Sequence, residues 1–559
     1  PMKRGGNQRF SLTLPLIEVG NFEAKVCFQP LRGGKNIWAE GKGNTFIKVE
    51  PARTVCANTI YTLFTRQFGD NKFADRKTVV ERKMLSALDA AGYTVIPPSG
   101  TFRDVIRELD FILGKLRCRI IQLLPIHPSP TTYGRMGRYG SPFAALDFFS
   151  VDPAYAEFDT KATPLEQFGE LVDAVHARHA RIFIDIPVNH TGWASQTQMA
   201  HPEWFERLSD RTFVSPGAWG VVWADLCKLN YHLPEVHNLM AEVFLYWCRR
   251  GVDGFRCDAG YMLPFEAWQY IVARVRNEYP DTVFLLEGLG GPLDVVHRLT
   301  GEAGLNWAYS ELFQNFSRDQ IGSYLPASNA ASMTSGLEVH FAETHDNNRL
   351  ASTSRTYAAM RTAMCAMFSH NGTFGFTNGV EWFADFKVSV HGAEPLNWGS
   401  EINQVEMIRR LHAIMEVNPA FWAGARLTLI QQGLDNVLAL RREAANGGSS
   451  VLILVNLNDK AAADCPWNRN DFACVPGQVV DLIGGGNVEI NMTGTLMSCR
   501  LEPGEVKCLS VDSAAVNAVE RVLDAAAGLP ERVLHQECRA IVLDVIGDGC
   551  GFGDVADWP

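Results

Sequence analysis

Between residues 59 and 420 the chain alternates short apolar runs with longer amphipathic stretches, and this alternation restricts the possible folds more than any other feature. The runs are TIYTLFTRQF, CRIIQLLPI, RIFIDIPV, GVDGFRC, TVFLLEG, WAYSEL, LEVHFAETH and TFGFTNGVE. Stretches such as DVIRELDFILGKLR and FEAWQYIVARVRNEY lie between them and have apolar residues at helical spacing. Eight buried strands with intervening helices predict an α/β protein built on a (β/α)8 TIM barrel, with a doubly wound open sheet as the alternative.

The segments on either side of this region have β character. We predict an N-terminal β-domain over 1–58, the catalytic barrel over 59–420 with a short excursion around 191–250, and a C-terminal β-sandwich domain over 421–512. Residues 513–559 form a predicted helical tail, which could be a linker to a missing module. A chain of 559 residues has room for two to four domains, in agreement with this division.

Composition excludes several classes of protein. The 51 Lys and Arg against 62 Asp and Glu give a net charge of −11 without a long basic run, so we expect no nucleic-acid partner. No apolar run is long enough to span a membrane, so we expect no membrane partner. The 13 cysteines are scattered and the first ten residues contain no apolar signal core, which predicts a cytoplasmic protein.

Charged and polar residues gather at the ends of four of the predicted strands. Active groups of a barrel lie at the carboxyl ends of its strands, so these residues are expected to meet at one mouth. They are Asp185, Asn189 and His190 after the third run, Arg256 and Asp258 in the fourth, Glu287 after the fifth, and His345, Asp346 and Arg349 after the seventh.

Such a cluster suits glycosidic bond cleavage. A retaining glycosidase needs two carboxyl groups about 5–5.5 Å apart whose pKa values are driven apart by their surroundings. Arg256 lies two residues before Asp258 and therefore on the same strand face, which favours Asp258 as an ionised nucleophile. Glu287 lies in apolar sequence, so burial would raise its pKa and suit a general acid. Asp346 is a third carboxylate that could stabilise positive charge in the transition state.

Four of these motifs together resemble the α-amylase family of glycoside hydrolases and transglycosylases. They are DIPVNH (185–190), GFRCD (254–258), LLEG (285–288) and ETHDNNR (343–349), and DFFSVDP (147–153) is similar to another family segment. The resemblance implies that Asp258 is the nucleophile, Glu287 the acid/base and Asp346 the transition-state stabiliser. The predicted substrate contacts are Arg256, His190, His345, Phe143 and, from the same strand-end cluster, Arg349.

The sequence departs from many starch-degrading relatives after the nucleophile. A Lys-His pair, which normally helps hold the acceptor sugar, is replaced by Tyr261 and Met262. Asn189 matches a calcium-ligand position, but few other oxygen ligands are near it, so we expect no metal and no cofactor. Arg135 and Arg138, in a loop near the predicted mouth, form either a phosphate site or an ordinary basic loop.

Four tryptophans in the excursion offer either sugar-stacking platforms or internal packing, namely Trp193, Trp204, Trp219 and Trp223. The resemblance implies double displacement on α-1,4-glucosidic bonds of an α-glucan or malto-oligosaccharide in glycogen metabolism. The alternatives are a 4-α-glucanotransferase, a phosphate-dependent maltosyltransferase, and a non-catalytic glucan-binding protein on an amylase-like barrel. A fused or docked second glycogen-metabolism module is a further expected partner.

Overall fold

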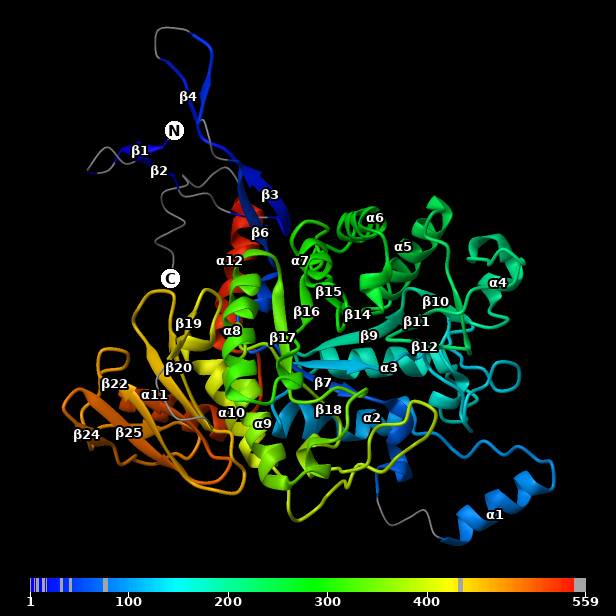
Figure 1. Ribbon diagram of the computed structural model, residues 1–559. Coiled ribbons are helices and arrows are strands. Elements are labelled where there is room, and N and C mark those ends of the chain that lie inside the picture. Colours follow the sequence, from blue (N-terminus) through cyan, green and yellow to red (C-terminus); the bar gives the residue numbers. More distant parts are fainter. Residues whose placement is uncertain are drawn as a thin grey trace.

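The computed structural model describes residues 2–4, 6, 10–12, 16, 18–30, 34–39, 43–73, 79–430 and 436–546. Eight parallel strands close into a barrel, so the barrel predicted from the eight apolar runs is confirmed (Figure 1). In barrel order the strands are β7 (Thr59–Leu63), β8 (Ile120–Leu123), β9 (Arg181–Pro187), β14 (Gly254–Asp258), β15 (Val283–Leu286), β16 (Trp307–Tyr309), β17 (Leu337–Phe341) and β18 (Phe374–Thr377).

A helix follows each of these strands before the next one begins, which is the arrangement that right-handed parallel connections require. The helices are α2 (Phe102–Leu109), α3 (Pro164–His176), α5 (Pro234–Cys248), α6 (Phe265–Arg276), α7 (Leu293–Gly301), α8 (Arg318–Thr334), α9 (Arg355–Met367) and α10 (Val405–Val417). Three of these helices begin at an N-cap residue that forms a reciprocal capping box, namely Thr101, Thr163 and Ser317. Large apolar side chains that include Ile60, Phe183 and Trp307 fill the barrel interior.

Two insertions project from the mouth side of the barrel. The first contains α1 (Val79–Ala90), which stands away from the body in Figure 1. The second lies between β9 and α5 and contains β10 (His190–Gly192), α4 (Gln196–Ala200), β11 (Gly217–Ala218), β12 (Val221–Val222) and β13 (Leu226–Lys228). β10 pairs with β13, and β11 pairs with β12 as a hairpin.

The N-terminal segment consists of two-stranded antiparallel ribbons that extend from the body (Figure 1). They pair β1 (Lys3–Arg4) with β2 (Phe10–Ser11), β3 (Gly20–Ala24) with β6 (Thr45–Val49), and β4 (Cys27–Phe28) with β5 (Ile37–Trp38). Lys48 anchors this segment to the barrel, because its ammonium donates to the carbonyls of Thr300, Leu305 and Asn306 at 2.9–3.2 Å.

The segment after the barrel folds into two antiparallel sheets that enclose their own apolar cluster. One sheet has the order β19 (Arg426–Ile430), β20 (Val437–Glu443), β21 (Ser450–Asn456), β26 (Val506–Ser510) and β23 (Val480–Asp481). The other has the order β22 (Ala463–Asn468), β25 (Leu496–Leu501) and β24 (Asn491–Thr493). The exact domain boundaries remain predictions.

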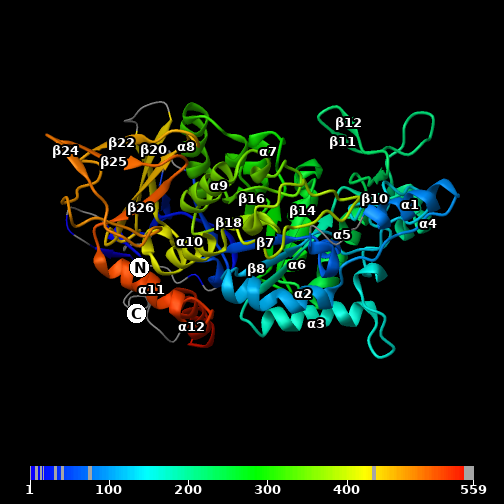
Figure 2. The ribbon, with the colours of Figure 1, turned by 90° about the horizontal axis from the view of Figure 1, so that it is seen from below.

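Two helices, α11 (Ser513–Asp524) and α12 (Glu531–Ile546), follow β26 of the five-stranded sheet and cross the end of the barrel opposite the mouth (Figures 1 and 2). Residues 547–559, the Gly-rich end of the predicted tail, lie outside the described residues. In the part of the chain that is described, no helix is both long and apolar enough to cross a membrane.

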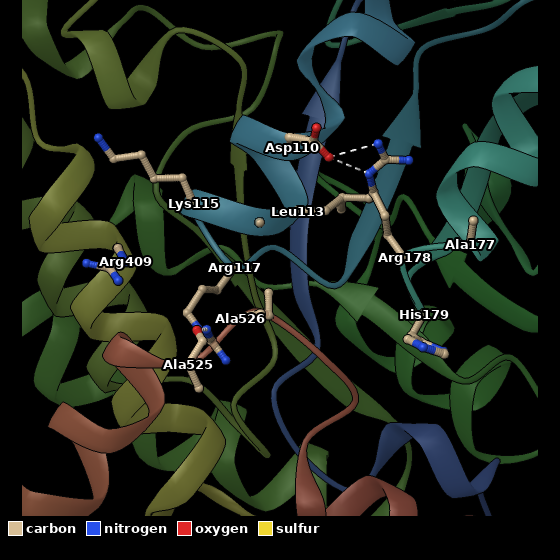
Figure 3. A pocket seen from close by; sticks show the side chains of 12 residues that line it. Asp110, Leu113, Lys115, Arg117, Ala177, Arg178, His179, Arg409, Ala525 and Ala526 are labelled. Carbon is tan, nitrogen blue, oxygen red and sulfur yellow. Dashed lines mark hydrogen bonds and ion pairs between the residues drawn. The ribbon is translucent and has the colours of Figure 1, made fainter.

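A hollow of about 750 Å³ lies where the link between α11 and α12 meets the barrel (Figure 3). The cations around it are engaged: Arg178 donates to Asp110 at 2.8 Å, and Arg117 bonds both Glu416 and the carbonyl of Ala525. Lys115 lies 3.3 Å from Glu406. The bond from Arg117 to Ala525 ties the tail to the barrel, and the ion pairs neutralise most of the positive charge around the hollow.

Arg442, on β20, joins the sheet to the barrel as a fully buried cation. Its guanidinium donates to the carbonyls of Met367, Ser369 and Ala420 at 2.8–2.9 Å and lies 4.0 Å from the centre of the Phe421 ring. Burial lowers its pKa to about 9. Met367 is the last residue of α9 and Ser369 lies two residues after it, so the guanidinium is at the carboxyl end of this helix, where a positive charge is favourable.

We expect Arg442→Met to lower the free energy of unfolding by about 2–4 kcal/mol, because three buried carbonyls lose their donor. The midpoint of thermal unfolding should fall accordingly. Arg500→Met on β25 is the matched control, since that side chain is 58% exposed and lies 3.5 Å from the equally exposed Asp464, so its loss should change the midpoint little. Equal midpoints for the two variants would show that the Arg442 bonds do not stabilise the junction.

Candidate active site

The sequence-predicted carboxylates lie at the carboxyl ends of neighbouring barrel strands. Asp258 is the last residue of β14, and Glu287 directly follows β15. β14 pairs with β9 on one side and with β15 on the other, so Arg256 lies opposite Asp185 and Leu285. This pairing brings the third, fourth and fifth strand ends together.

Arg256 is the centre of this group. Its guanidinium is 1% exposed and lies 2.8 Å from Asp185, 2.7 Å from Asp258 and 3.5 Å from Glu287. The two-residue spacing that placed Arg256 and Asp258 on one strand face therefore produces a direct ion pair. One buried cation holds three carboxylates, and it keeps Asp258 next to a positive charge.

Glu287 has a different environment from Asp258. Burial raises the pKa of Glu287 to about 7, and the charges of Asp258 and Asp346 add to this rise against the opposing effect of Arg256. One carboxylate oxygen accepts a bond of 2.7 Å from the backbone N–H of Ala259. Ala259 has a φ of 51°, so the chain turns sharply just after Asp258 and aims this N–H at Glu287.

Two histidines and Phe143 surround the carboxylates. His190 Nε2 lies 3.7 Å from Asp258 Oδ2, and His345 Nε2 lies 3.4 Å from Asp346 Oδ2. Burial lowers the pKa of both imidazoles, which keeps them neutral hydrogen-bonding groups near pH 7. The Phe143 ring stacks on His345 at 5.4 Å between ring centres and 12° between planes.

Asp346 and Arg349 differ sharply in exposure. The Asp346 side chain is 57% exposed in the loop after β17, whereas that of Arg349 is 1% exposed. The Arg349 guanidinium donates to Glu343 at 2.7 Å and to the carbonyls of Asn378 and Phe386 at 2.8 and 3.1 Å. These bonds support the loops behind Asp346, and the expected substrate contact by Arg349 stays a prediction.

The arginine loop is tied to the first insertion. Arg138 donates to Asp89 and to the carbonyl of Val95, both at 3.1 Å. Arg135 donates only weakly, at 3.5 Å, to the carbonyl of Arg138. The bonds of Arg138 give this loop a structural role in holding the segment that follows α1.

The side-chain NH2 group of Asn189, the residue that matches a calcium-ligand position, donates to Met262 Sδ at 3.3 Å. Among the residues that the structure describes, no three His, Cys, Asp or Glu side chains are grouped so that they could hold a metal ion. The expectation of a metal-independent enzyme remains a prediction.

Three further residues, to which the sequence-based prediction assigned no catalytic or substrate-binding role, lie at this mouth. Asp185 is fully buried beside Arg256, and the Tyr309 ring centre lies 5.6 Å from the Arg256 guanidinium. Tyr261 lies close enough to Glu287 and Asp258 for their charges to affect it. Asp185 was visible as a strand-end residue in DIPVNH, whereas Tyr309 had no sequence signal beyond its place in an apolar run.

Sequence comparison finds maltosyltransferases among the relatives, although no protein-family model matches the chain. The alpha-1,4-glucan:maltose-1-phosphate maltosyltransferase of Cereibacter sphaeroides is 26% identical over 431 residues, covering 70% of this chain and 61% of that enzyme. The enzyme of the same name from Rhodospirillum rubrum is 26% identical over 409 residues, covering 66% and 57%. The chain thus spans about three fifths of the length of these two relatives.

Comparison of folds finds α-amylases. The α-amylase of Lactobacillus plantarum superposes with a TM-score of 0.62 at 21% identity, covering 82% of this chain and 99% of that one. A maltogenic α-amylase of Thermotoga neapolitana gives a TM-score of 0.64 at 18% identity, covering 82% and 98%. The fold and the clustered carboxylates define a barrel enzyme of the glycoside hydrolase type. The resemblance to the α-amylase family that the four motifs carry is confirmed by these sequence relatives and by the shared fold.

Proposed function

We propose that this chain cleaves α-1,4-glucosidic bonds of an α-glucan or malto-oligosaccharide by a retaining double displacement. The observation that supports the proposal most is that Asp258 and Glu287, both close to Arg256, have different environments. Asp258 is 2.7 Å from this cation, while Glu287 is buried with a pKa of about 7. One carboxylate is thereby suited to attack as an anion and the other to give up a proton.

In the first step Glu287 donates its proton to the glycosidic oxygen while an oxygen of Asp258 attacks the anomeric carbon. The bond to the leaving sugar breaks with both electrons going to the departing oxygen, and a glycosyl ester forms on Asp258. In the second step Glu287, now an anion, takes a proton from water or a sugar hydroxyl, whose oxygen replaces Asp258. Water gives hydrolysis and a sugar gives transfer.

Asp346 and the neutral imidazoles are placed to bind the reacting sugar. Asp346 exposes more than half of its side chain and adds negative charge near Glu287, which suits the stabilisation of an oxocarbenium-like transition state. The His345 imidazole stacks on Phe143 and places its Nε2 3.4 Å from Asp346. We assign it to a sugar hydroxyl, and we assign the Phe143 face to the same ring.

The product ladder from maltoheptaose tests this function. Shorter products alone would establish a hydrolase, whereas products longer than the substrate would establish a 4-α-glucanotransferase. The names of the sequence relatives favour a third candidate, transfer of a maltosyl group from a sugar phosphate. Turnover of α-maltose 1-phosphate by this chain would support that candidate, and absence of all turnover would favour a non-catalytic glucan-binding protein.

A cytoplasmic location and a second glycogen-metabolism module belong to the same proposal. The cysteines of the described residues are free thiols, and most of them are buried, as in a reducing compartment. The docked tail of α11 and α12 is a surface that such a module could contact.

The pH dependence of the reaction should have an alkaline limb set by Glu287. The proposed acid must carry its proton, so kcat/KM for maltoheptaose should fall as the pH rises through about 7, by about tenfold per unit beyond it. Initial rates between pH 5 and 9 would measure this limb. A rate that stays constant up to pH 9 would contradict the assignment of the proton to Glu287.

A further inference from the structure

Tyr309 lies in the same layer of the barrel as the two proposed catalytic carboxylates. In the register of β14, β15 and β16, Asp258, Glu287 and Tyr309 occupy equivalent positions at the ends of neighbouring strands. Trp307, two residues before Tyr309, belongs to the apolar cluster inside the barrel, and residues two apart on a strand face the same side. Tyr309 therefore points inward, and with 4% of its surface exposed it is covered by its neighbours and not open to a substrate.

A hydrogen bond across the barrel interior holds the Tyr309 hydroxyl. β8 and β16 lie on opposite sides of the closed barrel, four strands apart in either direction. Gln122 of β8 is fully buried, and its side-chain amide donates to the Tyr309 hydroxyl at 3.0 Å. The bond links two opposite strands through their side chains, and it limits how far the tyrosine ring can tilt or slide.

Arg256 lies against this ring. Its guanidinium carbon is 5.6 Å from the centre of the Tyr309 ring and 5.7 Å from the centre of the Phe143 ring, which is within the range of a cation–π contact. The N–H groups of the same guanidinium bond Asp185 and Asp258. Carboxylates thus hold the N–H groups of Arg256, and two aromatic rings restrict where its guanidinium carbon can lie.

Stability alone does not require a polar pair at this position. A buried hydrogen bond contributes only about 1 kcal/mol net to the free energy of unfolding, and two apolar side chains of the same shape can replace both partners at little cost. Large apolar side chains such as Phe183 and Trp307 already fill this interior. The place of Gln122 and Tyr309 beside Arg256 gives the pair a use that two apolar side chains would lack.

The position of Arg256 affects both proposed catalytic carboxylates. Its guanidinium lies 2.7 Å from Asp258 and 3.5 Å from Glu287, and the energy between buried charges changes strongly with distance. Arg256 opposes the rise in the pKa of Glu287 to about 7, so a shift of this cation away would raise that pKa further. The charged and titratable groups that act on Glu287 are Arg256, Asp258, Asp346, Asp185, Tyr261 and Tyr309.

We propose that Tyr309 and Gln122 are positioning residues, which hold Arg256 against Asp258 and Glu287 from inside the barrel. The proposal rests on the proposed function, because the position of Arg256 matters to catalysis only through these two carboxylates. The pair touches neither the carboxylates nor a sugar, and it acts through the guanidinium alone.

Tyr309→Phe in the whole chain keeps the ring and removes the hydroxyl that Gln122 holds. We expect kcat for maltoheptaose to fall about tenfold with KM within about twofold, because Arg256 moves while the groups proposed to bind sugar stay. The alkaline limb of kcat/KM should move up by about half a pH unit, since a displaced Arg256 opposes the pKa rise of Glu287 less. A limb that stays in place would overturn the proposal.

Gln122→Leu and the double variant test whether the two residues act as a pair. Gln122→Leu should lower kcat and shift the limb as Tyr309→Phe does, and the double variant should lose no more than either single variant. The double variant places an apolar pair in the interior, so it should fold even if one single variant does not. Losses that multiply in the double variant would overturn the proposal.

Tyr155→Phe is the matched control for the loss of a buried hydroxyl. Tyr155 is 1% exposed, and its ring packs on Phe102 of α2 outside the barrel, at 6.0 Å between ring centres. This variant should leave kcat and the alkaline limb unchanged. An equal shift of the limb in Tyr155→Phe would show that the limb follows any change in buried packing, and would overturn the positioning role.

Direct titration of the Glu287 carboxyl separates this proposal from the proposed function, because it requires no turnover. Infrared difference spectra between pH 5 and 9, with Glu287→Gln to identify the band, should show this carboxyl titrating at higher pH in Tyr309→Phe than in the parent. The same shift in a chain that does not turn over maltoheptaose would support the positioning role and refute the proposed function alone. Equal titration in the two proteins would refute the positioning role whatever the activity.

Discussion

Asp258→Asn is expected to lower kcat on malto-oligosaccharides by at least about 10⁴-fold, because the amide cannot attack the anomeric carbon as an anion. The substitution preserves size and the ability to accept a hydrogen bond from Arg256, which lies 2.7 Å away. The fold and the sugar-binding groups should therefore survive. Release of reducing sugar from maltoheptaose, followed for long enough to detect one turnover per day, measures the loss.

Two controls make this result specific to the nucleophile. Asp294→Asn changes the same functional group on the exposed first turn of α7 and should leave kcat unchanged. Binding of maltotriose to Asp258→Asn should remain within about threefold of the parent, since the lost step is chemical. A decrease in kcat of less than tenfold would assign the nucleophile to another carboxylate and refute the proposed mechanism.

The sequence allowed the barrel to be predicted because its determinants are local. Each of the eight apolar runs is long enough to form one buried strand, and the stretches between them have the spacing of helices that cover a barrel. The ion pair between Arg256 and Asp258 was likewise predictable, since residues two apart on a strand face the same side. Strand order then brings Glu287 to the same mouth.

Contacts between loops that are far apart in the sequence could not be predicted from local patterns. Arg138 belonged to a basic loop in the sequence, and its partner Asp89 lies in a separate insertion. Arg349 ended a strand motif, and only the folded chain shows that its guanidinium donates to Glu343 and to the carbonyl of Asn378. Trp219 was one of four tryptophans in the excursion, and only the folded chain places its ring on Gly290. Each of these outcomes depends on which loops meet, and loop conformation has no periodic signal.

Glu287→Gln is expected to lower kcat on maltoheptaose by about 10³-fold, because the amide can donate no proton to a poor leaving group. Fluoride needs no such proton, so the first step with α-maltosyl fluoride should be far less affected. The glycosyl ester on Asp258 should then accumulate, since the amide cannot act as the general base that activates water. Mass spectrometry of the intact protein, mixed with α-maltosyl fluoride, would detect the added maltosyl group.

Azide gives the decisive readout, because it is an anion that attacks the ester without a general base. We expect millimolar azide to restore turnover of the fluoride by Glu287→Gln and to yield α-maltosyl azide, with the anomeric configuration retained by two successive displacements. The variant should also lose the alkaline limb near pH 7, since the group with that pKa is gone. Glu302→Gln, an exposed carboxylate at the end of α7, is the matched control and should keep both activity and the limb. Glu287 would not be the acid/base if Glu287→Gln lost the fluoride and maltoheptaose reactions equally and azide restored neither. The different environments of Asp258 and Glu287 beside Arg256 would then have only a structural role.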